Sequence, residues 1–201
     1  MIEIVCFGED SSHKKIISTI LNRLFDEEGV PFTQVWRNAT RGHGAVIKEL
    51  RLLLRDIQRD RGRFPDLIVV ATDGNCEGYI KRRNDITNLT DRIPGLRVVC
   101  AVPDPHIERW LLIDPSAFKA VLDVGCQAPD QKCERDRYKK LLRDAIRQTG
   151  ISPALGGIEY AEDIVNAMDL DRSARSDPSL AHFLSELRPV IRGWRAAIDI
   201  P

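Results

Sequence analysis

Carboxylates follow three of the apolar runs in the sequence, in positions that allow them to share one site. Glu9 follows the first run, Asp73 the third, and Asp104 with Glu108 the fourth. Carboxylates that are brought together repel unless a cation lies between them, and hard oxygen ligands suit Mg²⁺. A metal held in this way generates hydroxide and stabilises the leaving oxygen of a phosphodiester. These residue types therefore predict metal-assisted phosphoryl chemistry, with Mg²⁺ or Mn²⁺ as the cofactor.

Each of these acids, taken singly, is more often a helix cap than a ligand, because carboxylates favour the amino end of a helix. Asp104 stands between two prolines ahead of a predicted helix and is the best candidate for a cap. Glu9 and Asp73 each come directly after an apolar strand. We therefore expect these two residues to act together.

The elements that must position these acids alternate along the first half of the chain. Strands are predicted over 2–7, 32–36, the apolar part of 66–75, and 97–102, and amphipathic helices lie between them. This alternation predicts an α/β fold with a parallel sheet and helices on both faces. The carboxyl ends of parallel strands lie on one edge of the sheet, where ligands bind in such folds.

The pattern changes after Asp114, since residues 115–201 contain no convincing strand. Helices are predicted near 116–123, 133–148, 159–168 and 178–198. We expect an α/β domain over 1–114 and a helical extension over 115–201 that packs on it.

The composition of the chain and the motifs that it lacks argue against several classes of function. The chain has 201 residues, with 30 basic and 30 acidic residues, which argues against an all-over electrostatic nucleic-acid binder but allows a local basic groove. No phosphate loop and no GxGxxG fingerprint occur, so neither a P-loop ATPase nor a dinucleotide-binding domain is expected. No apolar stretch approaches the roughly 20 residues that span a bilayer. The sequence predicts no membrane association.

Cysteine usage predicts the compartment. Five cysteines are present, and Met1 leads straight into a strand without a signal peptide, so we expect reduced thiols in a cytoplasmic protein. Cys6 and Cys100 fall in strands and are expected in the core. Cys126 and Cys133 are too far apart for a CxxC pair, which makes a zinc site improbable.

Three segments carry a family resemblance. Phe7-Gly8-Glu9 and Thr72-Asp73-Gly74-Asn75 resemble the glutamate and Asp-x-Asp motifs of the Toprim domain, which topoisomerases, primases and overcoming-lysogenization-defect nucleases share. The run VPDPHIERWLLID over 102–114 is similar to a segment of small stand-alone Toprim-like proteins, often encoded beside an ABC-type ATPase in anti-phage operons. The resemblance covers 1–114 well and the helical tail only loosely.

The resemblance implies a Toprim-like parallel sheet of about four strands. It implies a Mg²⁺- or Mn²⁺-dependent nuclease that cleaves DNA or RNA as an effector subunit, with an ABC-type ATPase as partner. Glu9, Asp73 and Glu108 would be catalytic, and Glu9 and Asp73 would bind metal with Asn75 and Asp104. Asn75 replaces the second acid of Asp-x-Asp, which either weakens the metal site or transfers the role of that acid to Glu77, Asp104 or Glu108. A homo-oligomer is compatible with this assignment.

A basic loop after the second strand is the candidate nucleic-acid contact. Arg37, Arg41 and His43 lie on the predicted ligand edge, and glycines between them permit close backbone approach. A plain solvated loop is the alternative. The arginine stripe at positions 51, 55 and 59 is more often a solvated helix face, and His106 is expected to be a loop histidine.

Two other functions fit the sequence. The first is a catalytically inert, Toprim-like binding or regulatory subunit, and Asn75 is its best support. The second is a phosphoacceptor receiver domain, which Glu9-Asp10 and Asp73 resemble. The sequence lacks the lysine-proline turn that such a domain requires, and the helical tail has no place in it.

Overall fold

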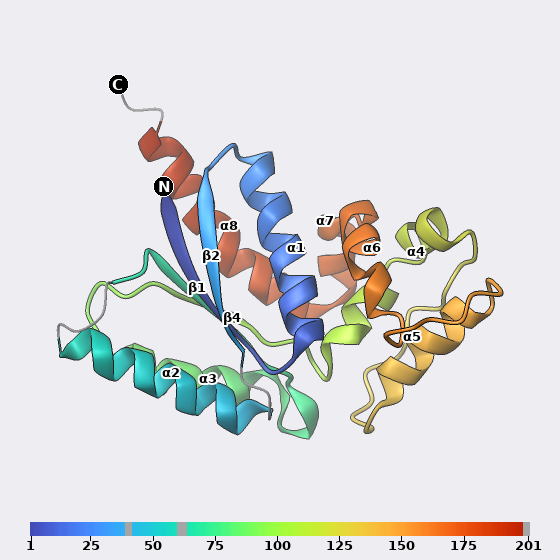
Figure 1. Ribbon diagram of the computed structural model, residues 1–201, viewed down its shortest axis with the longest axis horizontal. Helices are drawn as coiled ribbons and strands as arrows, with labels where there is room; N and C mark the ends of the chain where they lie inside the picture. The colour runs from blue at the N-terminus through green and yellow to red at the C-terminus, as the bar shows by residue number, and fades with distance from the viewer. Residues whose placement is uncertain (39–41, 60–63, 199–201) are drawn as a thin grey trace.

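A four-stranded parallel sheet forms the centre of the protein. The computed structural model describes residues 1–38, 42–59 and 64–198. The strand order is β2-β1-β3-β4, and every neighbouring pair is parallel (Figure 1). The predicted α/β class is therefore confirmed. The strands are β1 (Ile2–Gly8), β2 (Phe32–Asn38), β3 (Leu67–Ala71) and β4 (Val98–Ala101).

Helices connect the strands and continue to the end of the described chain. The first half contains α1 (Ser11–Glu27), α2 (His43–Gln58), the 3-10 helix η1 (Asn75–Glu77), α3 (Gly78–Thr90) and the 3-10 helix η2 (Ile107–Leu112). The second half contains α4 (Pro115–Leu122), α5 (Arg137–Arg147), η3 (Ile158–Tyr160), α6 (Ala161–Ala167), α7 (Leu170–Ser176) and α8 (Pro178–Ile198). Helix α7 was not predicted, and α5 begins four residues later than expected.

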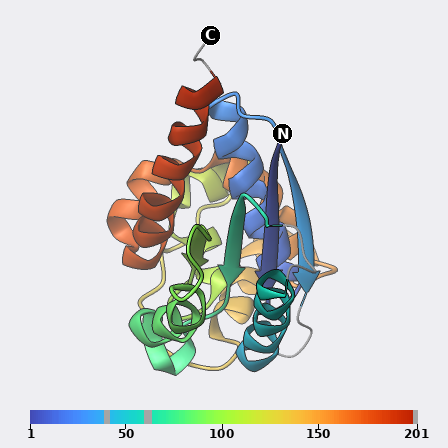
Figure 2. The same cartoon turned by 90° about the vertical axis from the view of Figure 1, so that its left-hand side faces the viewer.

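Alternating residues of the strands pack into two separate hydrophobic cores, one on each face of the sheet. Val5, Phe7, Ile68 and Val70 face α2 and α3. The neighbouring strand residues face a larger core, which contains α1 and apolar residues of every helix from α4 to α8. Figure 2 shows this second layer, which includes α1 and α8, across the sheet from α2 and α3. The period of two along each strand produces this division.

The helices from α4 onward pack against the sheet rather than stand apart from it. The carboxylate of Glu186 on α8 accepts a hydrogen bond from the backbone N–H of Cys100 at 3.2 Å, so α8 covers the edge strand β4. Arg109 of η2 forms a buried ion pair with Asp177, and the Asp177 carboxylate also accepts from the Leu180 N–H at 2.9 Å at the start of α8. Across the described residues, no helix combines the length and apolar character needed to cross a membrane.

Candidate functional site at the carboxyl edge of the sheet

Glu9 and Asp73 meet where β1 and β3 end. The Asp73 N–H donates a 3.0 Å hydrogen bond to Glu9 Oε1, and the Thr72 hydroxyl donates a short one to the same oxygen. These contacts arise because β1 and β3 are adjacent and parallel, with Gly8 beside Ala71 in register. Burial raises the pKa of Glu9, and the charge of Asp73 adds to that effect against the hydrogen bond from Thr72.

His43 belongs to this contact chain and lies behind Thr72. Its Nδ1 is 2.9 Å from the Thr72 hydroxyl oxygen, and its Nε2 is 3.2 Å from a carboxylate oxygen of Asp85 on α3. Burial, followed by the charge of Arg82, lowers the pKa of His43. Both ring nitrogens of this predicted nucleic-acid contact are therefore engaged within the protein.

The two other predicted nucleic-acid contacts have different outcomes. Arg37 is exposed at the end of β2. Arg41 lies outside the described residues.

Asp73 is held by three donors. Its Oδ1 accepts from the Ile107 N–H at 2.9 Å and lies 3.1 Å from His13 Nε2, while its Oδ2 lies 3.1 Å from His106 Nδ1. Burial alone would raise the pKa of Asp73, but the His13 charge and the two imidazole contacts lower it below the usual value. Asp73 is therefore a carboxylate held ionised by its surroundings.

His13 is a buried link between two carboxylates. Its Nδ1 lies 2.9 Å from Asp10, and its Nε2 faces Asp73. Burial by itself would lower the pKa of His13, but the two carboxylates have the larger combined effect and raise it well above its usual value. Asp10 also accepts from the backbone N–H groups of Ser12 and His13, so it caps α1.

Glu108 and Lys139 form the outer part of the site. Glu108 is only 3% exposed, and its carboxylate lies 3.7 Å from Lys139 Nζ on α5. The same ammonium group lies 3.7 Å from Asp10. Burial and then the charge of Asp73 raise the pKa of Glu108. A cavity of about 280 Å³ opens beside these three residues.

Asp104 and Asn75 shape the turn after β3. Asp104 Oδ2 accepts from the Tyr79 N–H at 3.1 Å and so caps α3, while a Cβ on Gly74 would lie only 3.0 Å from Asp104 Oδ1. Asn75 has a positive φ of 48° and its N–H donates to the Pro105 carbonyl at 2.9 Å. Asparagine tolerates this left-handed conformation better than most residues, so Asn75 has a structural role in the turn.

The donor set allows a small metal site rather than a closed cage. Within the described ranges, no three histidine, cysteine, aspartate or glutamate side chains are grouped so as to hold a metal ion. Mg²⁺ is nevertheless often bound by one or two carboxylates, with water and substrate phosphates as further ligands. Glu9 and Asp73 are neighbouring oxygen donors of this kind, although both oxygens of Asp73 also face donors of the protein.

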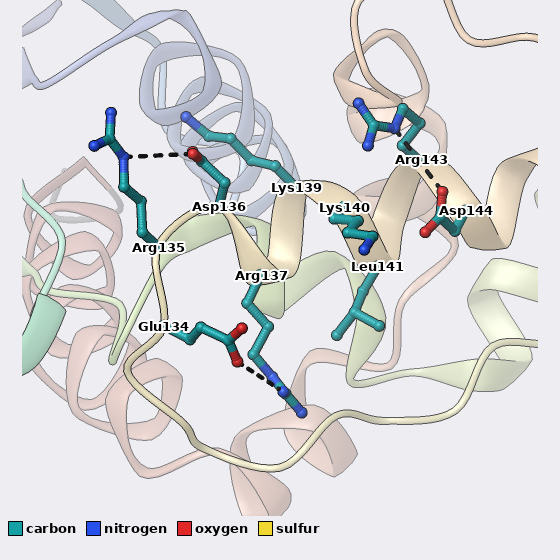
Figure 3. A pocket seen from close by; sticks show the side chains of 9 residues that line it. All are labelled: Glu134, Arg135, Asp136, Arg137, Lys139, Lys140, Leu141, Arg143 and Asp144. Atoms are coloured by element: carbon teal, nitrogen blue, oxygen red, sulfur yellow. Dashed lines mark hydrogen bonds and ion pairs between the residues drawn. The ribbon is translucent and has the colours of Figure 1, made fainter.

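A charged cavity continues from Lys139 along α5. Its volume is about 600 Å³. Figure 3 shows basic side chains fanning out from α5 and the turn before it, with acidic neighbours between them. It is lined by Glu134, Arg135, Asp136, Arg137, Lys139, Lys140, Leu141, Arg143 and Asp144. Of the residues that line this cavity, Lys139 lies within 3.7 Å of both Asp10 and Glu108 and so connects the cavity to the acidic edge of the sheet.

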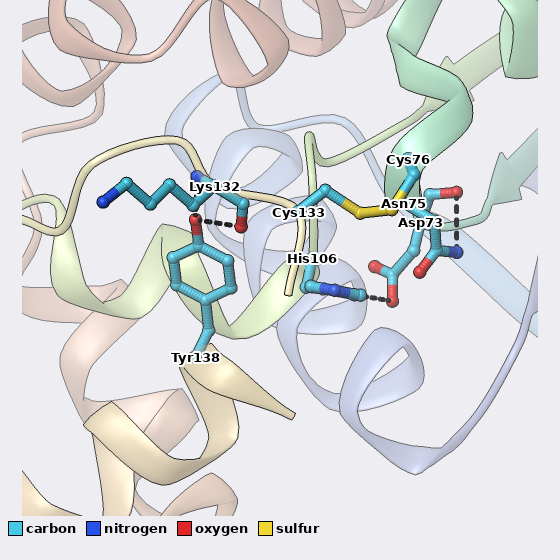
Figure 4. The surroundings of a disulfide bond; sticks show 7 residues. All are labelled: Asp73, Asn75, Cys76, His106, Lys132, Cys133 and Tyr138. Carbon is cyan, nitrogen blue, oxygen red and sulfur yellow. Dashed lines mark hydrogen bonds and ion pairs between the residues drawn. A yellow bond between two sulfur atoms is a disulfide. The ribbon is translucent and has the colours of Figure 1, made fainter. Parts of the chain in front are cut away.

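A disulfide joins Cys76 to Cys133, which corrects the expectation that all five thiols are reduced. The two Cα atoms are 5.3 Å apart although 57 positions separate the residues in sequence. The chain before α5 passes over the turn after β3 and brings the two sulfurs together (Figure 4). Cys6 and Cys100 are buried free thiols, as expected for core residues.

Sequence reasoning missed the histidines that hold Asp73. His13 carries a usable signal, because it stands three residues after Asp10 in the first turn of a helix that follows a strand. His106 precedes η2 and carries no such signal. Lys139 reaches the site only because α5 packs against η2, which no local pattern specifies.

Comparison with known proteins gives a family. The family described as "Domain of unknown function (DUF4276)" matches residues 8–188. No curated protein matches the chain, and no solved structure does. The matched region includes Glu9, Asp73, Glu108 and Lys139 together with all the helices that support them. The chain belongs to the DUF4276 family.

Proposed function

We propose that the protein is a Toprim-type nuclease that hydrolyses phosphodiesters of DNA or RNA with Mg²⁺ or Mn²⁺. The observation that carries the proposal is the direct contact between Glu9 and the Asp73 backbone at the carboxyl edge of a parallel sheet. In this proposal the chain works in the cytoplasm as the effector subunit of an ABC-type ATPase in phage defence. A homo-oligomeric state is compatible with it.

Each residue of the proposed site has its own role in the reaction or in the structure. Glu9 and Asp73 would hold the metal, which would activate a water molecule and stabilise charge on the phosphate. Asn75 and Asp104 keep the turn after β3 in place beside them. Glu108 is buried with a raised pKa, so it retains a proton closer to neutrality than an ordinary glutamate and suits proton transfer. Lys139 contacts the phosphate from the side of α5, and Arg37 contacts the backbone of the nucleic acid next to that phosphate.

Plasmid nicking and RNA cleavage test the proposal. Purified protein, with and without its ATPase partner, is incubated with supercoiled DNA or structured RNA in Mg²⁺, Mn²⁺ or EDTA. We expect metal-dependent cleavage that Glu9→Gln and Asp73→Asn abolish. Asp66→Asn is the matched control, since Asp66 precedes β3 at the opposite edge and accepts from the Glu3 N–H at 2.8 Å. Unchanged cleavage in both site variants contradicts the assignment.

A second function is favoured by the way Asp73 is held. Three donors already occupy its two oxygens, and Asn75 brings no charge. These contacts suit a catalytically inert binding or regulatory subunit of the same kind of complex. Calorimetry with Mn²⁺ separates the two functions. A nuclease should bind the ion, and Glu9→Gln should weaken that binding. An inert subunit should give no heat of binding.

A further inference from the structure

The disulfide Cys76–Cys133 lies on the surface, beside the candidate site. Both cysteines are exposed. Cys76 is three residues after Asp73, and Cys133 precedes the helix that carries Lys139. Figure 4 shows His106 and Tyr138 among the surroundings of the bond, with His106 turned toward Asp73. Exposed disulfides are more readily reduced than buried structural ones.

The segment that the disulfide fastens has no helix or strand of its own. Residues 123–136 connect α4 to α5 and are mostly exposed. Hydrogen bonds from Arg109, Arg137 and Tyr138 also hold it, among them the 3.3 Å contact from Arg109 to the Pro129 carbonyl and the 2.8 Å contact from the Lys132 N–H to the Tyr138 hydroxyl. Among the described residues, the disulfide is the covalent link between this segment and the turn after β3, so its loss leaves only non-covalent contacts to hold the segment there.

Release of the segment changes the surroundings of His106. Its Nδ1 faces Asp73, while its Nε2 is buried without a hydrogen-bond partner in the described structure. The His106 ring lies 5.9 Å from that of Tyr138, whose hydroxyl anchors the segment through the Asp130 carbonyl at 2.7 Å. The segment, Tyr138 and the disulfide thus enclose the outer side of the residue that holds Asp73.

We propose that Cys76–Cys133 is a thiol–disulfide exchange site that controls access to this edge, with a dithiol reductant as its reaction partner. A thiolate of the reductant attacks one sulfur, the bond between Cys76 and Cys133 breaks, and a mixed disulfide forms. The second thiolate of the reductant displaces the remaining sulfur. Two electrons pass to the cysteines, which become thiols with the two protons of the reductant, and the reductant leaves as its own disulfide. In the oxidised protein the segment is fastened beside His106, and in the reduced protein this fastening is lost.

The other cysteines do not share this chemistry. Burial raises the pKa of Cys100 to about 12 and, largely, that of Cys126 to about 11, so neither supplies thiolate near neutral pH. Cys6 is fully buried. Reduction without denaturant is therefore expected to expose two reactive thiols, those of Cys76 and Cys133.

Alkylation tests the exchange site. The folded full-length chain is treated with dithiothreitol or with oxidised glutathione, blocked with N-ethylmaleimide, and mapped by mass spectrometry. We expect adducts on Cys76 and Cys133 after reduction and their disappearance after re-oxidation, with Cys126→Ser behaving as wild type. Adducts that persist in oxidised glutathione, or a bond that resists dithiothreitol in the native protein, overturn the assignment.

Trypsin cleavage tests the opening. Lys132 and Arg135 lie in the fastened segment, and we expect them to be cut about tenfold faster in the reduced protein. Cys133→Ser should be cut at the fast rate in both conditions, and Cys126→Ser should follow wild type. Equal rates in the two redox states of wild type overturn the gating.

The consequence for activity rests on the proposed function, and nicking should be faster after reduction. Neither alkylation nor trypsin cleavage uses nuclease activity, so absence of nicking in every state contradicts the nuclease alone. Nicking that is equal in both redox states, with cleavage by trypsin that differs, contradicts gating of the active edge.

Discussion

The two sides of the sheet prepare their carboxylates in opposite ways. On the side of α2 and α3, Glu9 accepts hydrogen bonds from an uncharged hydroxyl and an amide, and its pKa is raised; His43, whose pKa is lowered, lies behind them. On the side of α1 and η2, Asp73 is bonded to two imidazoles and its pKa is lowered. One edge of the sheet therefore combines a carboxyl group whose pKa is raised with one whose pKa is lowered.

Asp73→Asn should have the largest effect on stability. It leaves buried His13 without its main counter-charge, and breaking a buried pair in this way costs about 3–5 kcal/mol. Glu9→Gln keeps an acceptor oxygen and removes no paired charge, so its cost should be much smaller. Urea unfolding of the two variants measures the difference, and equal losses would contradict the contrast between the two sides.

Thr72→Val should come next. The valine keeps the shape of Thr72 but leaves Glu9 and His43 without their shared hydroxyl, and a buried unsatisfied polar group costs about 1–3 kcal/mol. Thr90→Val is the control, because the Thr90 hydroxyl donates only to helix carbonyls. A smaller loss for Thr72→Val than for Thr90→Val would sink the idea that the hydroxyl couples the two residues.

The pH dependence of stability tests the Asp73 side directly. The pKa of His13 is raised in the folded protein, so its stabilisation is complete below about pH 6.5 and is lost as the pH rises through the folded value. The pKa of Asp73 is lowered, so its contribution is present above about pH 4 and is lost on acidification. The free-energy difference between wild type and His13→Gln, measured by urea unfolding in metal-free buffer, should shrink above pH 6.5. A constant difference would show that His13 is neutral.

Lys139→Met should have the smallest effect on stability. The Lys139 side chain is 53% exposed, and ion pairs of that kind contribute about 0–1 kcal/mol. Lys140→Met, one position along, is the matched control without a contact to Glu108. In the proposed nuclease, Lys139→Met should nevertheless weaken binding of single-stranded DNA more than Lys140→Met does, as fluorescence anisotropy measures. Equal affinities would remove Lys139 from the phosphate contact.

The sheet and the meeting of Glu9 with Asp73 could be predicted because both depend on local patterns. Apolar runs marked the four strands, and parallel alternation placed the residues after them on one edge. The surroundings of Asp73 depend on contacts between distant segments. His13, His106 and Lys139 come from three elements whose packing no short window encodes, and the Cys76–Cys133 pair requires a loop crossing.

The shared core between the sheet and α8 has a consequence for synthesis on the ribosome. The last strand ends at Ala101, but the core on the α1 side includes Leu187 and Ile191. The side of α2 and α3 has all its helices by Thr90, whereas the other side stays partly uncovered until α8 emerges. Nascent chains halted shortly after Ala101 should therefore bind chaperones through one face of the sheet, because newly made domains with exposed apolar surface are prone to aggregation.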